Sequence, residues 1–164
     1  MNSAVLNASP FIVLARAGYL DLVPRLVSSV VIPRAVVTEV LAGPASDAAA
    51  QFLRKPSWLT VVDLTPPLSP LAGWRLGLGE SEVLEHARRQ IGTTAILDDR
   101  AARRAAHALG ISVTGTLGVV AAAAHQGLLP SLADAINAVR KCGLYVDEQL
   151  VSRLLNDVLG PVRK

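Results

Sequence analysis

Several side chains that carry oxygen atoms lie next to short apolar segments of this chain, where catalytic and metal-binding groups are often found. Asn7 follows the apolar segment 4–6, and Asp98 and Asp99 follow the segment 94–97. The full set is Asn7, Ser9, Glu39, Glu80, Asp98 and Asp99. Carboxylates that gather without a cationic partner repel one another, and a divalent cation removes that repulsion. Oxygen ligands suit Mg²⁺ or Mn²⁺, which activate water and stabilise in-line displacement at phosphorus.

Each of these residues also has a purely structural interpretation that the sequence leaves open. Either of the two adjacent aspartates, or Ser9, would serve as an N-cap, because its oxygen accepts a hydrogen bond from a free helical N–H group. Glu80 would complement the positive end of a helix dipole. Glu39 fits the solvated side of an amphipathic helix, and Asn7 fits a side-chain-closed turn. Only their arrangement in one place would favour a metal site.

The apolar pattern predicts strands that alternate with helices. The expected strands are 4–6, 30–32, 58–64, 94–97 and 111–113. The expected helices are 10–17, 20–28, 33–41, 45–53, 80–90, 99–109, 117–126, 132–142 and 147–159, with a long loop at 65–79. Short apolar strands separated by helices indicate a parallel sheet buried on both faces. The predicted fold class is therefore α/β, with helical layers on both sides of a central parallel sheet, and we expect one domain over residues 1–164.

Composition excludes several other classes of protein. The 164 residues are 51% hydrophobic with a mean hydropathy of +0.42, which is too apolar for a disordered chain. The sequence contains no run of about 20 apolar residues, so we expect neither a membrane span nor a signal peptide, and we predict a cytoplasmic protein. With one cysteine, Cys142, and three scattered histidines, a disulfide and a cysteine-based zinc site are also excluded.

The positive charge of the chain is carried mainly by arginine. The net charge is only +3, but arginine is suited to forked contacts with phosphate. Arg100, Arg103, Arg104 and His107 have the spacing of one helix face directly after the two aspartates. This stripe fits either an RNA backbone or the solvated face of an amphipathic helix. An acidic cluster beside a basic stripe favours a phosphodiester substrate.

Four segments in order resemble PIN domains and cover nearly the whole chain. They read VLNASPFIVLARAGYL (5–20), VIPRAVVTEVL (31–41), LGLGESEVLEHA (76–87) and AILDDRAARRAAHALGISVTGTLGVV (95–120). The resemblance implies a three-layer α/β/α fold with a central parallel sheet. It also implies a nuclease that uses Mg²⁺ or Mn²⁺ to cleave RNA, in many members the toxin of a toxin–antitoxin pair.

The resemblance also assigns roles to individual positions. The four acidic positions of the family fall on Asn7, on Glu39, on Glu80 with Glu82 as a second choice, and on Asp98 or Asp99, of which alignment favours Asp99. Ser9 has a supporting role there. Arg100, Arg103 and Arg104 are the predicted RNA contacts.

The chain departs from the family at Asn7, where most members have aspartate. An amide oxygen still coordinates a cation but brings no charge, so weaker metal binding is expected. The alternative function is therefore a PIN-fold module that binds RNA or a protein with little or no catalysis. The predicted partners are RNA, an antitoxin and a second copy of the chain. The amphipathic segment 132–159 would pack either on the core or on that second copy.

Overall fold

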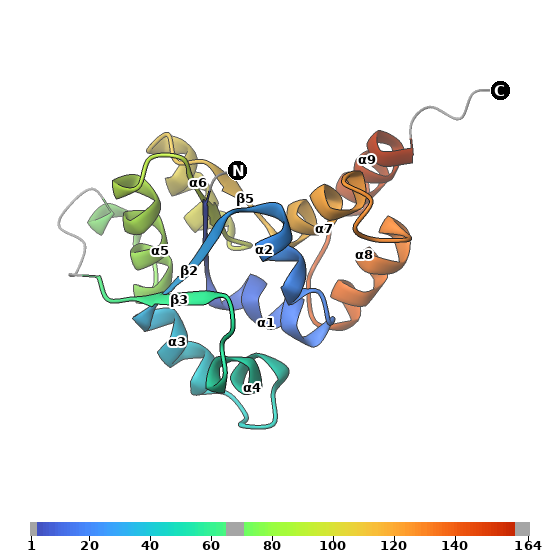
Figure 1. Ribbon diagram of the computed structural model, residues 1–164. Coiled ribbons are helices and arrows are strands. Elements are labelled where there is room, and N and C mark those ends of the chain that lie inside the picture. Colours follow the sequence, from blue (N-terminus) through green and yellow to red (C-terminus); the bar gives the residue numbers. More distant parts are fainter. Residues whose placement is uncertain (1–2, 65–70, 160–164) are drawn as a thin grey trace.

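Strands and helices alternate through most of the chain in the computed structural model, which describes residues 3–64 and 71–159 (Figure 1). The strands are β1 (Ser3–Leu6), β2 (Ser29–Pro33), β3 (Leu59–Val62), β4 (Thr93–Ile96) and β5 (Val113–Thr114). The longer helices are α1 (Ala8–Arg16), α3 (Arg34–Leu41), α4 (Ala48–Arg54), α5 (Leu78–Arg89), α6 (Arg100–Ala108), α7 (Thr116–His125), α8 (Leu132–Lys141) and α9 (Glu148–Leu159). Three short helices complete the set: η1 (Leu20–Leu22), α2 (Val23–Leu26) and η2 (Ala72–Trp74).

The five strands form one parallel sheet in the order β3-β2-β1-β4-β5. β1 lies between β2 and β4, with Val5 beside Val31 on one side and Ala95 on the other. The chain thus builds outward from β1 to β3 and then crosses to β4 on the opposite side of β1. In such sheets the carboxyl ends of the two strands at this crossing form a crevice that commonly binds ligands. Here those ends lead into Asn7 after β1 and Leu97 and Asp98 after β4.

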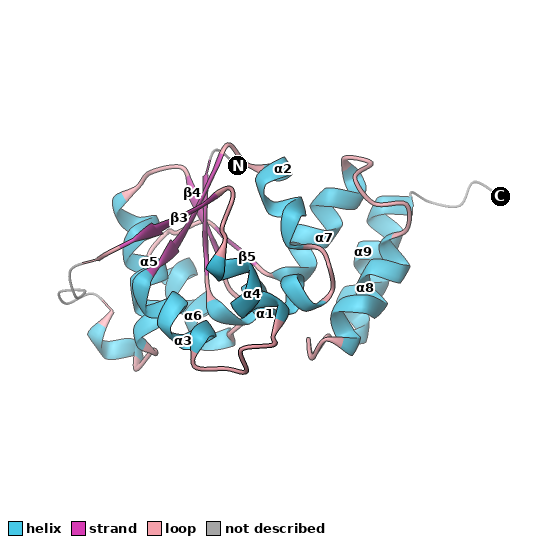
Figure 2. Ribbon diagram, turned by 60° about the horizontal axis from the view of Figure 1, so that its bottom comes forward, coloured by secondary structure: helices cyan, strands magenta, loops and turns pink. Residues whose placement is uncertain are grey.

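Helices cover both faces of the sheet, which confirms the predicted three-layer α/β/α fold (Figure 2). α5 and α6 contact each other on one face, and α1 contacts α4, α7 and α8 on the other. α7, α8 and α9 pack together beside the sheet. The largest fully buried side chains are mostly aliphatic and come from both strands and helices: Phe11, Leu6, Leu14, Ile32, Leu84, Ile96, Leu97 and Ile136. No helix among the described residues is long and apolar enough to cross a bilayer.

The first helix starts earlier than the sequence predicts, and this changes the role of Ser9. α1 begins at Ala8 with Asn7 as its N-cap residue, so Ser9 and Pro10 lie inside the first turn, and the prediction that Ser9 caps the helix is wrong. The Asn7 N–H group donates to the Ile96 carbonyl of β4, while its own carbonyl accepts from Phe11. The first turn of α1 therefore begins directly after the hydrogen bond between Asn7 and Ile96. The Asn7 side chain makes no cap hydrogen bond.

Other element boundaries shift by a few residues for local reasons. The helix expected at 45–53 begins at Ala48, because the Asp47 carboxylate caps it by accepting from the Ala49 N–H group at 2.9 Å. The segment 20–28 is split into η1 and α2. The loop expected at 65–79 contains η2 and ends at Leu78, where α5 begins, and its residues 65–70 lie outside the described part of the chain.

Candidate active site

A pocket of about 820 Å³ lies at the carboxyl ends of β1 and β4 and gathers most of the sequence-predicted residues. Its polar lining residues include Asn7, Ser9, Glu39, Glu80, Asp98, Asp99, Arg100 and Arg103. They come from four separate parts of the chain, which the crossover between β1 and β4 brings together. Arg104 is not among the residues that line this pocket, and its side chain is exposed on α6. Glu82 does not line it either.

Asn7 and Glu39 approach each other across Gly79 of α5. A Cβ atom placed on Gly79 would lie 3.1 Å from Glu39 Oε2 and 3.4 Å from Asn7 Oδ1. Asn7 is only 5% exposed, and its Oδ1 atom is buried with no hydrogen-bond partner among the described residues. A buried carbonyl oxygen left unpaired costs free energy, so it indicates a missing partner that binds oxygen. The absence of a side chain at Gly79 leaves space beside both oxygens.

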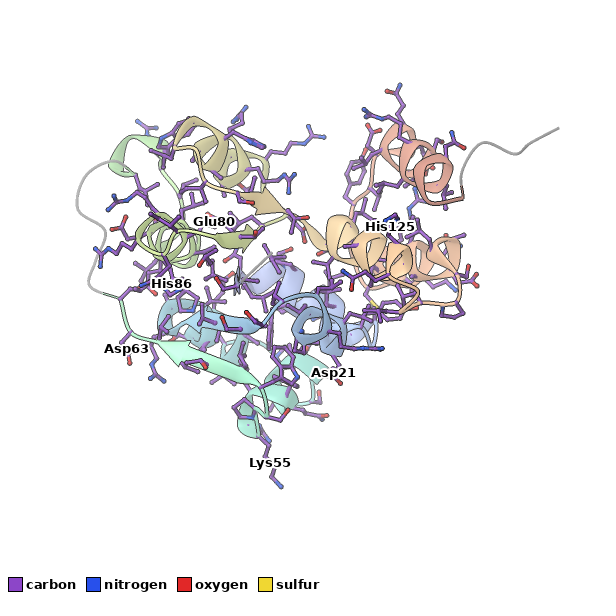
Figure 3. All side chains as sticks on the ribbon, turned by 45° about the horizontal axis from the view of Figure 1, so that its top comes forward. Asp21, Lys55, Asp63, Glu80, His86 and His125 are labelled. Carbon is purple, nitrogen blue, oxygen red and sulfur yellow. The ribbon has the colours of Figure 1, made fainter. Side chains whose placement is uncertain are left out.

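Glu39 and Glu80 form an electrostatically unfavourable pair in this pocket. The pKa of the Glu39 carboxyl is raised above its ordinary value, first because partial burial removes water and second because the Glu80 carboxylate repels its charge. Glu80 lies in the first turn of α5 (Figure 3), where its Oε2 atom accepts from the Gly77 N–H group at 2.8 Å. This bond fixes one Glu80 oxygen against the helix end.

Asp98 is held rigidly by the start of α7. Its Oδ1 atom accepts from the Thr116 N–H group at 2.8 Å, and its Oδ2 atom accepts from the Thr116 hydroxyl at 2.6 Å. The contact needs the glycine at position 115, since a Cβ atom there would lie 2.8 Å from Asp98 Oδ1. The sequence did not indicate a role for Thr116 or Gly115, although the motif TGT at 114–116 lies in the segment 95–120 that resembles PIN domains.

The two alternatives left open by the sequence differ clearly in geometry. Asp99 is the N-cap of α6 and accepts from the Ala102 N–H group at 2.8 Å, so the structural role predicted for an aspartate here is present in Asp99, which also lines the pocket. Glu82 is 7% exposed, and its Oε2 atom accepts from the Ala35 N–H group at the start of α3. Glu82 therefore ties α5 to α3, whereas Glu80 faces the pocket.

The basic side chains of α6 divide into two kinds. Arg103 lines the pocket and donates from Nη1 to the Leu97 carbonyl at 3.0 Å, while Arg100 lines the pocket and is exposed. Arg88 and Arg89 of α5, in contrast, both pair with the single buried Glu85 carboxylate, which offsets one of their two charges. Among the residues that the structure describes, Arg100 and Arg103 alone add positive charge to the lining of the pocket.

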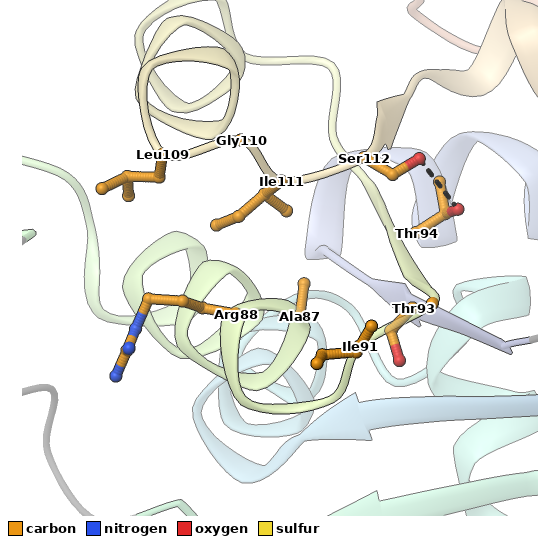
Figure 4. A pocket seen from close by; sticks show the side chains of 10 residues that line it. Ala87, Arg88, Ile91, Thr93, Thr94, Leu109, Gly110, Ile111 and Ser112 are labelled. Carbon is orange, nitrogen blue, oxygen red and sulfur yellow. Dashed lines mark hydrogen bonds between the residues drawn. The ribbon is translucent and has the colours of Figure 1, made fainter.

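A second pocket, of about 510 Å³, lies at the opposite, amino end of β4 (Figure 4). It lies between the end of α5 and the connection from α6 to β5, where Thr94 and Ser112 share a hydrogen bond of 3.2 Å. No carboxylate is among its lining residues. The candidate chemistry therefore lies at the carboxyl ends of the strands.

The donors of the larger pocket fit a hard divalent cation in type. All are oxygens, and one of them, Asn7 Oδ1, is buried without a partner in the described chain. Among the described residues, however, no three acidic, histidine or cysteine side chains stand close enough to hold one ion. Two subgroups are present instead: Asn7, Glu39 and Glu80 around Gly79, and the adjacent aspartates bound to α6 and α7.

The space beside Gly79 can be tested by filling it. Gly79→Ala is expected to weaken binding of Mn²⁺ at least about tenfold, because the new methyl group would displace Glu39 Oε2 and crowd Asn7 Oδ1. Position 79 is helical, so alanine suits the backbone, but the methyl group would also lie 3.1 Å from Val36 Cγ2, and thermal unfolding of the variant verifies that the core is intact. Calorimetric titration with Mn²⁺ measures the effect. Gly73→Ala is the matched control, because no atom lies within 4 Å of a Cβ atom there; equal affinity in both variants would contradict the prediction.

The raised pKa of Glu39 predicts a pH-dependent cost to stability. A carboxyl whose pKa is higher in the folded state stabilises the fold below its unfolded pKa and loses that contribution as pH rises through its folded pKa. In chelator, Glu39→Gln should therefore have a larger free energy of unfolding than wild type at pH 7, and the difference should vanish below about pH 4. Urea unfolding across this pH range measures it. A variant less stable than wild type at pH 7 would contradict the assignment.

Comparison with known proteins agrees with the fold. A family model described as a PIN domain, DUF3368, matches residues 3–159. Searches of curated proteins and of solved structures returned no match to the chain. PIN domains are generally nucleases that use divalent metals. The match extends over nearly the whole chain and confirms the family predicted from the sequence, and the chain therefore belongs to the PIN-domain family.

Proposed function

We propose that this protein is a metal-dependent endoribonuclease that cleaves single-stranded RNA in the pocket at the carboxyl ends of β1 and β4. The observation that carries the proposal is the buried, unpartnered Asn7 Oδ1 atom beside Glu39. A cation at this point would satisfy the amide oxygen and relieve the repulsion between Glu39 and Glu80. The family supports nuclease chemistry in general. RNA as substrate and Mg²⁺ or Mn²⁺ as cofactor belong to our proposal.

The proposed mechanism divides the residues of the pocket by task. Asn7, Glu39 and Glu80 would hold a divalent ion through their side-chain oxygens. Asp98 and Asp99 would add two further carboxylates to the pocket lining, and these four carboxylates with Asn7 are called the acidic wall. Such an ion supplies Lewis-acid stabilisation of the phosphate and a water of lowered pKa. Thr116 orients Asp98 by donating to both of its carboxylate oxygens, which fixes the direction in which that carboxylate points. Arg100 and Arg103 contact the phosphate backbone and position the strand against the acidic wall.

A cleavage assay tests the proposal directly. A fluorescently labelled single-stranded RNA and the DNA of the same sequence are incubated with the protein in Mg²⁺, in Mn²⁺ and in chelator. We expect internal cuts in the RNA with either metal and no cuts in chelator. Absence of cleavage of several unrelated RNAs with both metals would contradict the proposal.

A second candidate function is a binding module without catalysis, and Asn7 is the observation that favours it. With an amide at this position, the site carries one negative charge fewer than it would carry with an acidic residue. Calorimetry separates the two functions: a binding module should bind RNA in chelator and take up no Mg²⁺ or Mn²⁺ at millimolar concentration. Two further predictions come from the sequence. The first is a role as a toxin inhibited by an antitoxin, which co-expression with the adjacent gene tests. The second is a homodimer, which analytical ultracentrifugation tests.

A further inference from the structure

We propose that Tyr145 forms a stacking platform for one unpaired base of the RNA strand, in the same pocket as the acidic residues. The inference rests on the proposed function, because it assigns the part of the substrate that the pocket would bind beyond the phosphate. Tyr145 lies in the connection between α8 and α9. This connection and α9 supply much of the apolar part of the pocket lining: Gly143, Leu144, Tyr145, Val146, Leu150 and Leu154.

Tyr145 is much more exposed than the apolar residues on either side of it. Its relative accessibility is 88%, whereas its neighbours Leu144 and Val146 are packed against the core. Among the large hydrophobic side chains of the described residues, it is the one exposed aromatic. An aromatic side chain held out of the core, at the wall of a pocket, presents a free ring face. Stacking on such a face is available to every base, because each base has its own π surface.

The backbone around Tyr145 is fixed at both ends. At the end of α8, Gly143 has a φ of +103°, and the N–H groups of Gly143 and Leu144 bind the carbonyls of Arg140 and Val139. This is the glycine-based helix end in which the last free carbonyls are satisfied. At the start of α9, Asp147 Oδ1 accepts from the Gln149 and Leu150 N–H groups at 2.8 and 3.1 Å.

An ion pair also links the two helices on either side of this connection. Arg140 of α8 donates to Glu148 of α9, so the two helices are joined across the connection formed by residues 142–147. Because the ends are fixed, little conformational freedom of the backbone is lost when a ligand contacts Tyr145. The exposed ring is therefore carried by a preorganised backbone, which lowers the entropic cost of stacking.

The remaining charges of the pocket indicate what kind of ligand brings the base. Arg100 and Arg103 suit phosphate, and the acidic residues suit a cation bridging to phosphate. A volume of about 820 Å³ lies in the range of pockets that enclose a small ligand, and it leaves room for a base next to a bound phosphate. An apolar peptide segment would use Tyr145 and Leu150 but would leave these charges unpaired. A nucleotide of a single strand uses both parts of the pocket.

The test combines a substitution of Tyr145 with removal of single bases from the RNA. Affinities are measured by fluorescence anisotropy in Ca²⁺ for a short RNA and for a series of the same RNA with one abasic position each. For the intact RNA, Tyr145→Ala should raise Kd about 5- to 150-fold, and Tyr145→Phe should stay close to wild type because the ring remains. One abasic position should weaken binding to wild type but should have little further effect on Tyr145→Ala. Ile91→Ala, which removes an exposed apolar side chain at the opposite end of β4, is the matched control.

The outcomes separate this inference from the function on which it rests. If wild type cleaves and binds RNA and Tyr145→Ala binds equally well, the stacking site is wrong while the nuclease proposal stands, and an apolar protein segment becomes the better occupant of this wall. If Tyr145→Ala binds more weakly but every abasic RNA loses affinity equally in both proteins, Tyr145 acts through the fold, and the inference is also wrong. If wild type neither binds nor cleaves RNA, the proposed function fails first. Circular dichroism of Tyr145→Ala verifies that the exposed substitution leaves the fold intact.

Discussion

Glu39→Gln is expected to reduce metal-dependent RNA cleavage by about 10²- to 10³-fold while the protein stays folded. Metal stabilisation of charge in the transition state contributes several kcal/mol, and each 1.4 kcal/mol corresponds to a tenfold change in rate. Glu39 supplies the charged oxygen beside the orphan Asn7 Oδ1 atom, so its neutral isostere keeps the shape of the pocket but removes this charge. Single-turnover cleavage of a labelled RNA in Mn²⁺ measures the effect.

The opposite effects of this substitution on activity and on stability make it diagnostic. In chelator, the same variant should be more stable than wild type at pH 7, because ionised Glu39 is disfavoured first by partial burial and second by repulsion from Glu80. Asp134→Asn provides the matched control, since Asp134 is an exposed carboxylate on α8 that does not line the pocket. It should leave the cleavage rate within about twofold of wild type. Full activity in Glu39→Gln would remove Glu39 from the proposed metal site.

Asn7→Asp is expected to strengthen binding of Mg²⁺ or Mn²⁺ by about tenfold or more and to destabilise the metal-free protein. A carboxylate in place of the amide adds a negative charge next to Glu39. The added charge should strengthen the binding of a divalent cation. Without the cation, the same charge is buried at a position only 5% exposed and has like-charged neighbours. This should cost about 1–3 kcal/mol of unfolding free energy. Calorimetric titration and thermal unfolding with and without metal measure both effects.

A surface substitution of the same kind separates the pocket from a general charge effect. Asn137 is exposed on α8, so Asn137→Asp adds the same charge away from the pocket and should change neither metal affinity nor metal-free stability appreciably. If Asn7→Asp binds metal no better than wild type, the orphan oxygen of Asn7 is not a ligand. The non-catalytic binding module would then be the better account of this chain.

The layout of the fold was predictable because it depends on local apolar patterns. Segments 4–6, 30–32 and 94–97 are apolar, short and separated by helical patterns, and parallel strands buried on both faces require such segments. All three are strands of the sheet to within one residue at either end. Boundaries were less predictable where a cap competes with composition, as at Asp47, whose side chain starts α4 three residues later than the alanine-rich sequence indicates.

The candidate site was predictable as a set of residues but not as a geometry. The family segments and the strand ends both indicated Asn7, Glu39, Glu80, Asp98 and Asp99, and all five line one pocket. Their roles as ligands remain a proposal. The part of the pocket around Tyr145 was not predicted, because its lining residues lie in a connection that follows none of the strands and reaches the pocket only through the packing of α7, α8 and α9.

The sequence by itself determined the fold class and the family, since apolar spacing and short motifs are properties of neighbouring residues. Only the tertiary structure decided what each polar side chain faces. Glu80 and Glu82 are two residues apart on α5, yet one lines the pocket and the other binds the N-terminus of α3. Likewise, Asp98 is fixed by Thr116, 18 residues away, while Asp99 caps its own helix. The physical reason is that hydrogen-bond partners and burial are supplied by elements distant in the sequence, so adjacent carboxylates acquire different environments only when the sheet and its helices assemble.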